Sequence, residues 1–133
     1  MARVLLADDD PASRLTLQTV LEAGGYRVDS AASAAEAVGL LDQSEYSLVL
    51  SDLSMESPEA GLKVLAHARM KEYRPATALV TSWHSDEGGE DKASGSRVKM
   101  LIQPQNVPEL LGHVASLIGK RASRRVARRL RPA

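Results

Sequence analysis

The sequence contains no cysteine and no phenylalanine, and aromatic residues make up only 3% of its 133 positions. Without cysteine, the chain has no disulfide, no thiolate metal site and no thiol nucleophile. The shortage of aromatic rings argues against a stacking platform for single-stranded nucleic acid. Residues 4–7 form the longest apolar run near the N-terminus and are followed by three aspartates, so this run is too short for a signal-peptide core or a membrane span. We therefore expect one cytoplasmic domain of ordinary size.

The formal net charge is zero, but the two signs are unevenly distributed along the chain. Residues 1–119 contain ten basic and seventeen acidic residues, whereas residues 120–131 contain seven basic residues and no acidic one. This asymmetry predicts an acidic domain over 1–119 followed by a basic extension or linker over 120–133.

The basic extension has two interpretations. It is either a solvated, disordered end or a continuation of the last helix, because Ala122, Val126 and Leu130 recur every four residues. A helical extension would be a basic amphipathic arm suited to nucleic acid or to an anionic surface, such as a membrane or an acidic partner.

Short apolar runs alternate with segments of helical spacing along residues 1–119. The runs predict five strands, at 3–7, 26–31, 47–52, 76–81 and 98–102. Helix starts are indicated by Asp10 before Pro11, by Ser33 and by Asn106, and Leu15 and Leu17 are assigned to the apolar face of the first helix. The alternation predicts an α/β fold with a five-stranded parallel sheet and helices on both faces. Residues 84–96 are rich in glycine, serine and acidic residues, so we expect a short or disordered fourth helix there.

Polar side chains follow several of the predicted strands at their carboxyl ends. Asp8 and Asp9 follow the first strand, Asp52 ends the third and Thr81 ends the fourth. The carboxyl ends of parallel strands meet at one edge of the sheet, where ligands bind in such folds. Carboxylates placed close together raise one another's pKa unless a cation lies among them, and Mg²⁺ prefers oxygen ligands of this kind. Asp10, by contrast, is assigned to capping the first helix.

Three of these segments carry a family resemblance. Val-Leu-Leu-Ala-Asp-Asp-Asp-Pro at 4–11, Leu-Val-Leu-Ser-Asp-Leu at 48–53 and Ala-Leu-Val-Thr-Ser at 78–82 resemble the CheY-like receiver domain of bacterial two-component response regulators. The similarity covers about residues 2–119. It implies a flavodoxin-like (βα)5 fold with strand order 2-1-3-4-5.

The resemblance also implies a role for individual residues. Asp52 corresponds to the aspartate that accepts a phosphoryl group from a sensor histidine kinase or phosphotransfer protein, and the signal then passes to an output protein. Mg²⁺ would be held by Asp8, Asp9, Asp52 and the backbone carbonyl of Ser54. Thr81 corresponds to the hydroxyl that turns toward the phosphoryl oxygens. Such a domain is not an enzyme beyond its own phosphoryl transfer and autodephosphorylation.

The sequence departs from the family pattern in the switch that responds to phosphorylation. Gln103 occupies the position of the usual lysine, and Met100 that of the usual aromatic residue. These departures leave open a phosphorylation-independent pseudo-receiver that acts as a protein-binding module. A Mg²⁺-dependent phosphatase or nuclease is a third hypothesis, but the sequence offers no evident general acid and no cationic substrate pocket.

Overall fold

The computed structural model describes residues 1–53, 55–80, 101–102 and 106–131. Strands and helices alternate through them in the order β1 (Arg3–Ala7), α1 (Pro11–Ala23), β2 (Arg27–Ala31), α2 (Ala34–Gln43), β3 (Leu48–Asp52), α3 (Pro58–Arg69), β4 (Ala76–Val80), β5 (Leu101–Ile102) and α5 (Val107–Arg129). None of the helices in this part of the chain is long and apolar enough to cross a membrane.

The strands form one parallel sheet in the order β2-β1-β3-β4-β5. The predicted flavodoxin-like order is confirmed for the first four strands. The fifth was predicted over 98–102, and only the two-residue segment β5, which pairs with β4, lies within the described residues. The predicted irregular fourth helix at 84–96, together with Met100, lies outside them.

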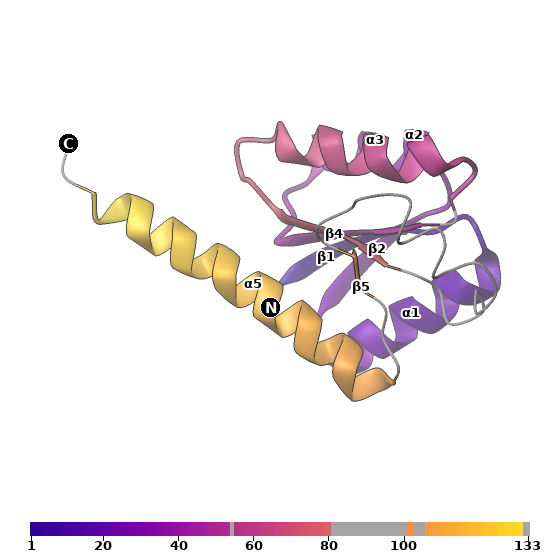
Figure 1. Ribbon diagram of the computed structural model, residues 1–133, viewed down its shortest axis with the longest axis horizontal. Helices are drawn as coiled ribbons and strands as arrows, with labels where there is room; N and C mark the ends of the chain where they lie inside the picture. Colours follow the sequence, from indigo (N-terminus) through magenta and orange to yellow (C-terminus); the bar gives the residue numbers. More distant parts are fainter. Residues whose placement is uncertain (54, 81–100, 103–105, 132–133) are drawn as a thin grey trace.

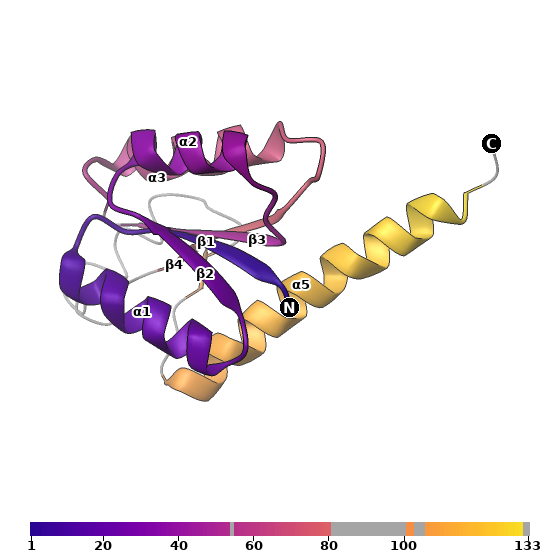
Figure 2. The same cartoon turned by 180° about the vertical axis from the view of Figure 1, so that it is seen from behind.

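Helices cover both faces of the sheet, as Figure 2 shows, with α1 and α5 on one face and α2 and α3 on the other. Alternate residues of each strand point to opposite faces, so β1 contributes to both cores. Val4 and Leu6 pack with Leu17 and Leu21 of α1, whereas Leu5 packs with Leu41 of α2. All five residues of β3 are buried, as is typical of a central parallel strand.

The predicted helix caps are present. Asp10, Ser33 and Asn106 each accept a hydrogen bond from the backbone N–H three residues further on, at 2.9, 3.1 and 2.9 Å. These bonds satisfy donors that have no partner inside the helix. Asp10 is therefore a capping residue, as the sequence analysis assigned it.

The basic extension is a continuation of the last helix, which was one of its two interpretations. Helix α5 continues without interruption to Arg129, and its C-terminal half projects beyond the body of the domain (Figure 1). Val126 and Leu130 are 52% and 77% exposed, so the apolar stripe continues along the projecting turns without packing on the sheet.

Close to the N-terminus, a polar cluster joins β1, β2 and the segment before β3. Arg3 forms an ion pair of 2.9 Å with Asp29, and its guanidinium lies 5.3 Å from the ring centroid of Tyr46. The buried Tyr46 hydroxyl donates to Asp29 at 2.8 Å. Partial burial raises the pKa of Asp29, but the hydrogen bonds from Tyr46 and Arg3 outweigh it and the net pKa is lowered. The cluster therefore stabilises the ionised carboxylate.

Helix α3 approaches the end of β3 closely through Gly61. A Cβ atom at this position would lie 3.1 Å from the backbone oxygen of Asp52 and 3.1 Å from Oγ of Ser51. Contacts that short are tighter than most side chains tolerate, so the glycine lets α3 pack directly against the strand that carries Asp52.

We predict that Tyr46→Phe lowers the free energy of unfolding at neutral pH by about 1.5 kcal/mol, because the ionised Asp29 loses a charge-assisted hydrogen bond. A lowered carboxyl pKa stabilises the fold above the unfolded value of 3.8, and this stabilisation disappears as the pH falls through the folded pKa. The difference between wild type and variant should therefore shrink below pH 3.8 in urea titrations. A difference that stays constant with pH would contradict the charge-dependent part of this account.

We also predict that Gly61→Ala and Gly39→Ala have opposite effects. Both glycines lie inside helices, where alanine is intrinsically favoured by about 1 kcal/mol. A Cβ at Gly39 meets nothing within 4 Å, so Gly39→Ala should raise the melting temperature, whereas Gly61→Ala should lower it by crowding Asp52 and Ser51. Equal stabilisation by the two substitutions would show that the contact at Gly61 is not tight.

Candidate functional site

Two buried carboxylates lie at the carboxyl edge of the sheet, on neighbouring strands. Asp52 is the last residue of β3, and Asp8 directly follows β1. The two strands pair in parallel with Ala7 opposite Ser51, so Asp8 and Asp52 leave the sheet side by side. Asp8 is fully buried and Asp52 is 1% exposed. Burying an ionised carboxylate is costly unless hydrogen bonds or a cation compensate.

Asp8 is fixed by its backbone and by one of its carboxylate oxygens. Its N–H donates to the carbonyl of Ala31 at 3.0 Å, and its own carbonyl accepts from Arg14 at 2.9 Å. Oδ1 accepts from the N–H of Asp10 at 3.0 Å. The other oxygen, Oδ2, is buried without a hydrogen-bond partner among the described residues. A buried acceptor of this kind costs about 1–3 kcal/mol, which a bound cation would offset. Asp8 therefore fits the metal ligand that the resemblance implies.

Asp9 is partly exposed and lies in a field of negative charge. Partial burial raises its pKa, and the charges of Asp8, Glu56 and Asp10 raise it further. Glu56, which no sequence motif indicated, comes from the loop before α3 and accepts a hydrogen bond from the N–H of Ala34 at 3.2 Å. The surroundings of Asp9 thus favour a cation and disfavour an unaccompanied anion.

The position of Asp52 is fixed by strand pairing with β4 and by close packing against α3. Its partner on β4 is Val80, and the N–H of Leu53 donates to the carbonyl of Val80 at 2.9 Å, so the pairing continues one residue past Asp52. On the other side lies α3, at Gly61. The sequence analysis also missed Gly61; a glycine inside a helical pattern was the available signal for such a close approach.

The remaining predicted site residues, Ser54, Thr81 and Gln103, lie outside the described residues. Within the part that is described, no three acidic or histidine side chains lie close enough to form a complete metal cage. The observed half of the site therefore consists of Asp8 and Asp52 on paired strands, with Asp9 next to Asp8.

Comparisons with known proteins agree with this geometry. The family model described as the response regulator receiver domain matches residues 4–115. The alginate biosynthesis transcriptional regulatory protein AlgB of Pseudomonas aeruginosa is 32% identical over 108 residues, which is 81% of this chain and 24% of that protein. The transcriptional regulatory protein PmrA of Pectobacterium parmentieri is 30% identical over 119 residues, which is 87% of this chain and 52% of that protein. This chain thus spans about a quarter and about half of the length of these two relatives.

Solved structures show the same fold. The response regulator protein TrrA of Thermotoga maritima, in complex with Mg²⁺ and beryllofluoride, has a TM-score of 0.68 and 29% identity, and the match covers 88% of this chain and 99% of that one. A CheY-like receiver domain protein of Methanospirillum hungatei has a TM-score of 0.72 at 22% identity, with 93% and 98% covered, which supports the fold alone. Together with the buried aspartates that end β3 and follow β1, these matches show that the chain belongs to the response regulator receiver domain family of two-component systems.

Proposed function

We propose that Asp52 accepts a phosphoryl group from a phosphohistidine of a sensor histidine kinase or phosphotransfer protein. We further propose that Mg²⁺ is held by Asp8, Asp9, Asp52 and the backbone carbonyl of Ser54. The observation that carries this proposal is the buried pair of carboxylates on β1 and β3, in which Oδ2 of Asp8 is a buried acceptor without a partner in the described part. The acidic field around Asp9 supports a cation at the same edge.

The proposed reaction is a phosphoryl transfer between two side chains. A carboxylate oxygen of Asp52 attacks phosphorus, an acyl phosphate bond forms, and the phosphorus–nitrogen bond to the donor imidazole breaks, after which the imidazole takes up a proton. Mg²⁺, when bound, neutralises charge on the transferring oxygens. The chain itself positions the nucleophile, because β3 is buried throughout and Gly61 brings α3 against its end.

The proposed switch has one positive charge fewer than is usual for the family, because position 103 is glutamine. Gln103 would offer an amide hydrogen bond where a lysine would form an ion pair, and charge-assisted bonds are about twice as strong as neutral ones. Thr81 would supply the hydroxyl that turns toward the phosphoryl oxygens. With Asp8, Asp9 and Glu56 close together and glutamine in place of lysine at position 103, charge neutralisation would depend more strongly on a Mg²⁺ ion held at this edge.

The wider role follows from the family and from the basic extension. We infer a cytoplasmic signalling protein in which phosphorylation of the domain controls an output protein, since the matched relatives include transcriptional regulators. The basic turns of α5 beyond residue 119 would contribute by attracting an anionic ligand.

The first test is the intact mass after incubation with a small phosphodonor and Mg²⁺. We expect wild type to gain the mass of one phosphoryl group and Asp52→Asn to gain none. Asp10→Asn is the matched control, because Asp10 caps α1 and should not affect acceptance. No gain in wild type would refute phosphorylation of Asp52, and so would an equal gain in Asp52→Asn.

A second test concerns the metal. Binding to the folded state alone raises the melting temperature by ligand linkage, so Mg²⁺ should stabilise wild type in a concentration-dependent manner. The rise should disappear in Asp9→Ala and persist in Asp42→Ala. Asp42 is an acidic residue on α2 that binds His67 and Lys71. A Mg²⁺ response that is absent from wild type, or unchanged by Asp9→Ala, would contradict the metal site.

A further inference from the structure

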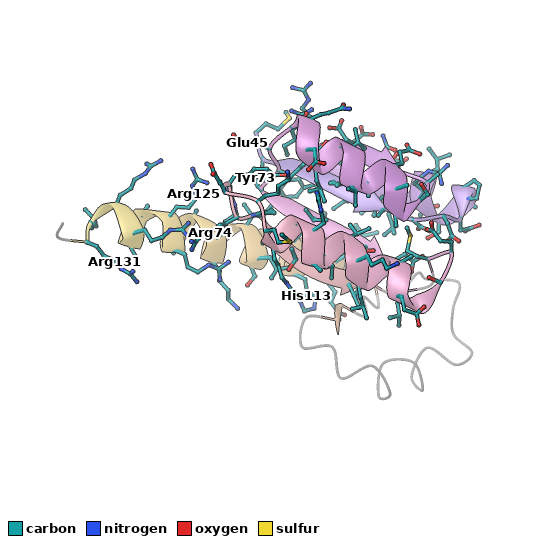
Figure 3. All side chains as sticks on the ribbon, turned by 90° about the horizontal axis from the view of Figure 1, so that it is seen from above. Glu45, Tyr73, Arg74, His113, Arg125 and Arg131 are labelled. Atoms are coloured by element: carbon teal, nitrogen blue, oxygen red, sulfur yellow. The ribbon has the colours of Figure 1, made fainter. Side chains whose placement is uncertain are left out.

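An arginine-lined cleft lies between the last turns of α5 and the connection from α3 to β4. Figure 3 shows Tyr73, Arg74 and Arg125 gathered where α5 passes this connection. The cleft has a volume of about 340 Å³, and its lining consists of Arg69, Arg74, Pro75, Arg121, Arg124 and Arg128. An adjoining hollow of about 290 Å³ shares Arg69, Pro75 and Arg124 with it and adds Lys120.

Hydrogen bonds between α5 and the connection hold the walls of the cleft together. Arg121 donates through Nε to the carbonyl of Arg74 at 3.0 Å and through Nη2 to the carbonyl of Tyr73 at 2.8 Å. Arg125 reaches the Tyr73 carbonyl at 3.3 Å, and the Tyr73 hydroxyl donates to the carbonyl of Leu41 on α2 at 2.9 Å. The cleft is therefore formed by the fold before any ligand arrives, which lowers the cost of binding.

No acidic side chain in the lining balances the positive charge of the arginines. The two lining sets contain no acidic residue, and no described carboxylate forms an ion pair with Arg74, Arg124 or Arg128. Arg128 is exposed, but slight desolvation lowers its pKa, and the charges of Arg74, Arg125, Arg124 and Arg131 lower it further. Such crowding of like charges is relieved when an anion binds among them.

Arg121 shows the same crowding, with one opposing contribution. Burial lowers its pKa first, and Arg125, Arg128 and Arg124 lower it further. Glu45, which is outside the cleft lining, favours the charged form. The spacing of Arg121, Arg124 and Arg128 at i, i+3 and i+7 places these three side chains on one face of α5.

The backbone at Arg74 is a second, independent feature of this site. Arg74 has a φ of 43°, and it is the one non-glycine residue with a positive φ among those described. This conformation costs about 1–3 kcal/mol and tends to occur where a functional arrangement requires it. Here it occurs in the residue that lines the cleft and whose carbonyl accepts from Arg121.

We propose that this cleft binds an oligophosphate group, meaning two or more linked phosphates carried by a small molecule. Planar guanidinium groups pair with phosphate oxygens through two parallel hydrogen bonds, and five of them supply more charge than a single phosphate uses. The volume agrees with small-ligand pockets, which are about 300–1,000 Å³. The lining contains no aromatic ring on which a nucleic-acid base could stack.

This site is separate from the phosphoryl-acceptor edge. Ala76 begins β4 beside the cleft, whereas the strands end at Asp52 and Val80 on the opposite edge of the sheet. The proposed ligand site therefore does not depend on the proposed phosphorylation of Asp52.

The test is calorimetric titration of the full chain with inorganic tripolyphosphate, without Mg²⁺. We expect saturable binding of one anion per chain. Arg124→Gln, which alters a residue of both hollows, should weaken it roughly tenfold or more, as expected for a lost charge-assisted hydrogen bond. Arg129→Gln is the matched control, because both arginines are exposed residues of the same helix and Arg129 lies outside the cleft lining. It should change the affinity by less than about twofold, as screened surface charges do.

Two further titrations show whether binding depends on Asp52 and whether the anion bound is a small oligophosphate or a nucleic acid. Asp52→Asn should bind tripolyphosphate as wild type does, which separates this proposal from the proposed function. A short DNA duplex should bind more weakly than tripolyphosphate at physiological salt. The proposal is overturned if wild type shows no saturable binding, if Arg124→Gln and Arg129→Gln lose affinity equally, or if only the duplex binds.

Discussion

The burial of two carboxylates at the ends of the central strands is the constraint on which the rest of this structure depends. Strand β3 is buried throughout and ends in Asp52, and β1 is followed by the fully buried Asp8. Burial is unfavourable for an ionised carboxylate unless its oxygens accept hydrogen bonds or contact a cation. The backbone of Asp10 compensates one oxygen of Asp8, while the other has no partner in the described residues. A cation bound at this edge would offset that cost, which is the physical basis of the proposed Mg²⁺ site.

The net charge of the chain is zero, but the two ends of the parallel strands carry charges of opposite sign. The carboxyl edge of the sheet carries Asp8, Asp9 and Asp52, and Glu56 adds to its negative field. Near the start of β4, at the opposite edge, α5, the end of α3 and the α3–β4 connection bring six basic side chains around the cleft and the hollow that adjoins it. The two edges thus favour ligands of opposite sign, the proposed Mg²⁺ at the first and the proposed oligophosphate group at the second. Because α5 packs on the sheet through Leu110, Val114 and Leu117 before it reaches the cleft, the basic edge is part of the folded domain.

Much of the fold was predictable because its signals are local. The caps at Asp10, Ser33 and Asn106 and the strands that end at Ala7 and Asp52 follow from short patterns. Leu15 was assigned to the same apolar face as Leu17 but is 66% exposed, because residues two apart in a helix point in different directions and Leu17 is the one that packs on the sheet. The carboxylates were predictable because strand ends meet at one edge. The cleft could not be predicted from the sequence, since Arg69 and Arg74 are about fifty residues from the basic extension and only the fold brings them together. Whether the extension is helical or disordered was also open, and hydrogen bonds from Arg121 to distant carbonyls help to decide it.

We propose that the buried carboxylates form a Mg²⁺-dependent phosphoryl-acceptor site on Asp52, and a crystal structure of this chain grown with Mg²⁺ and beryllofluoride would test this proposal. We expect beryllofluoride bonded to a carboxylate oxygen of Asp52, with Mg²⁺ in contact with Asp8 or Asp9 and a main-chain oxygen of residue 54. Electron density without beryllofluoride at Asp52 under saturating conditions, or with Mg²⁺ away from Asp8 and Asp9, would contradict it.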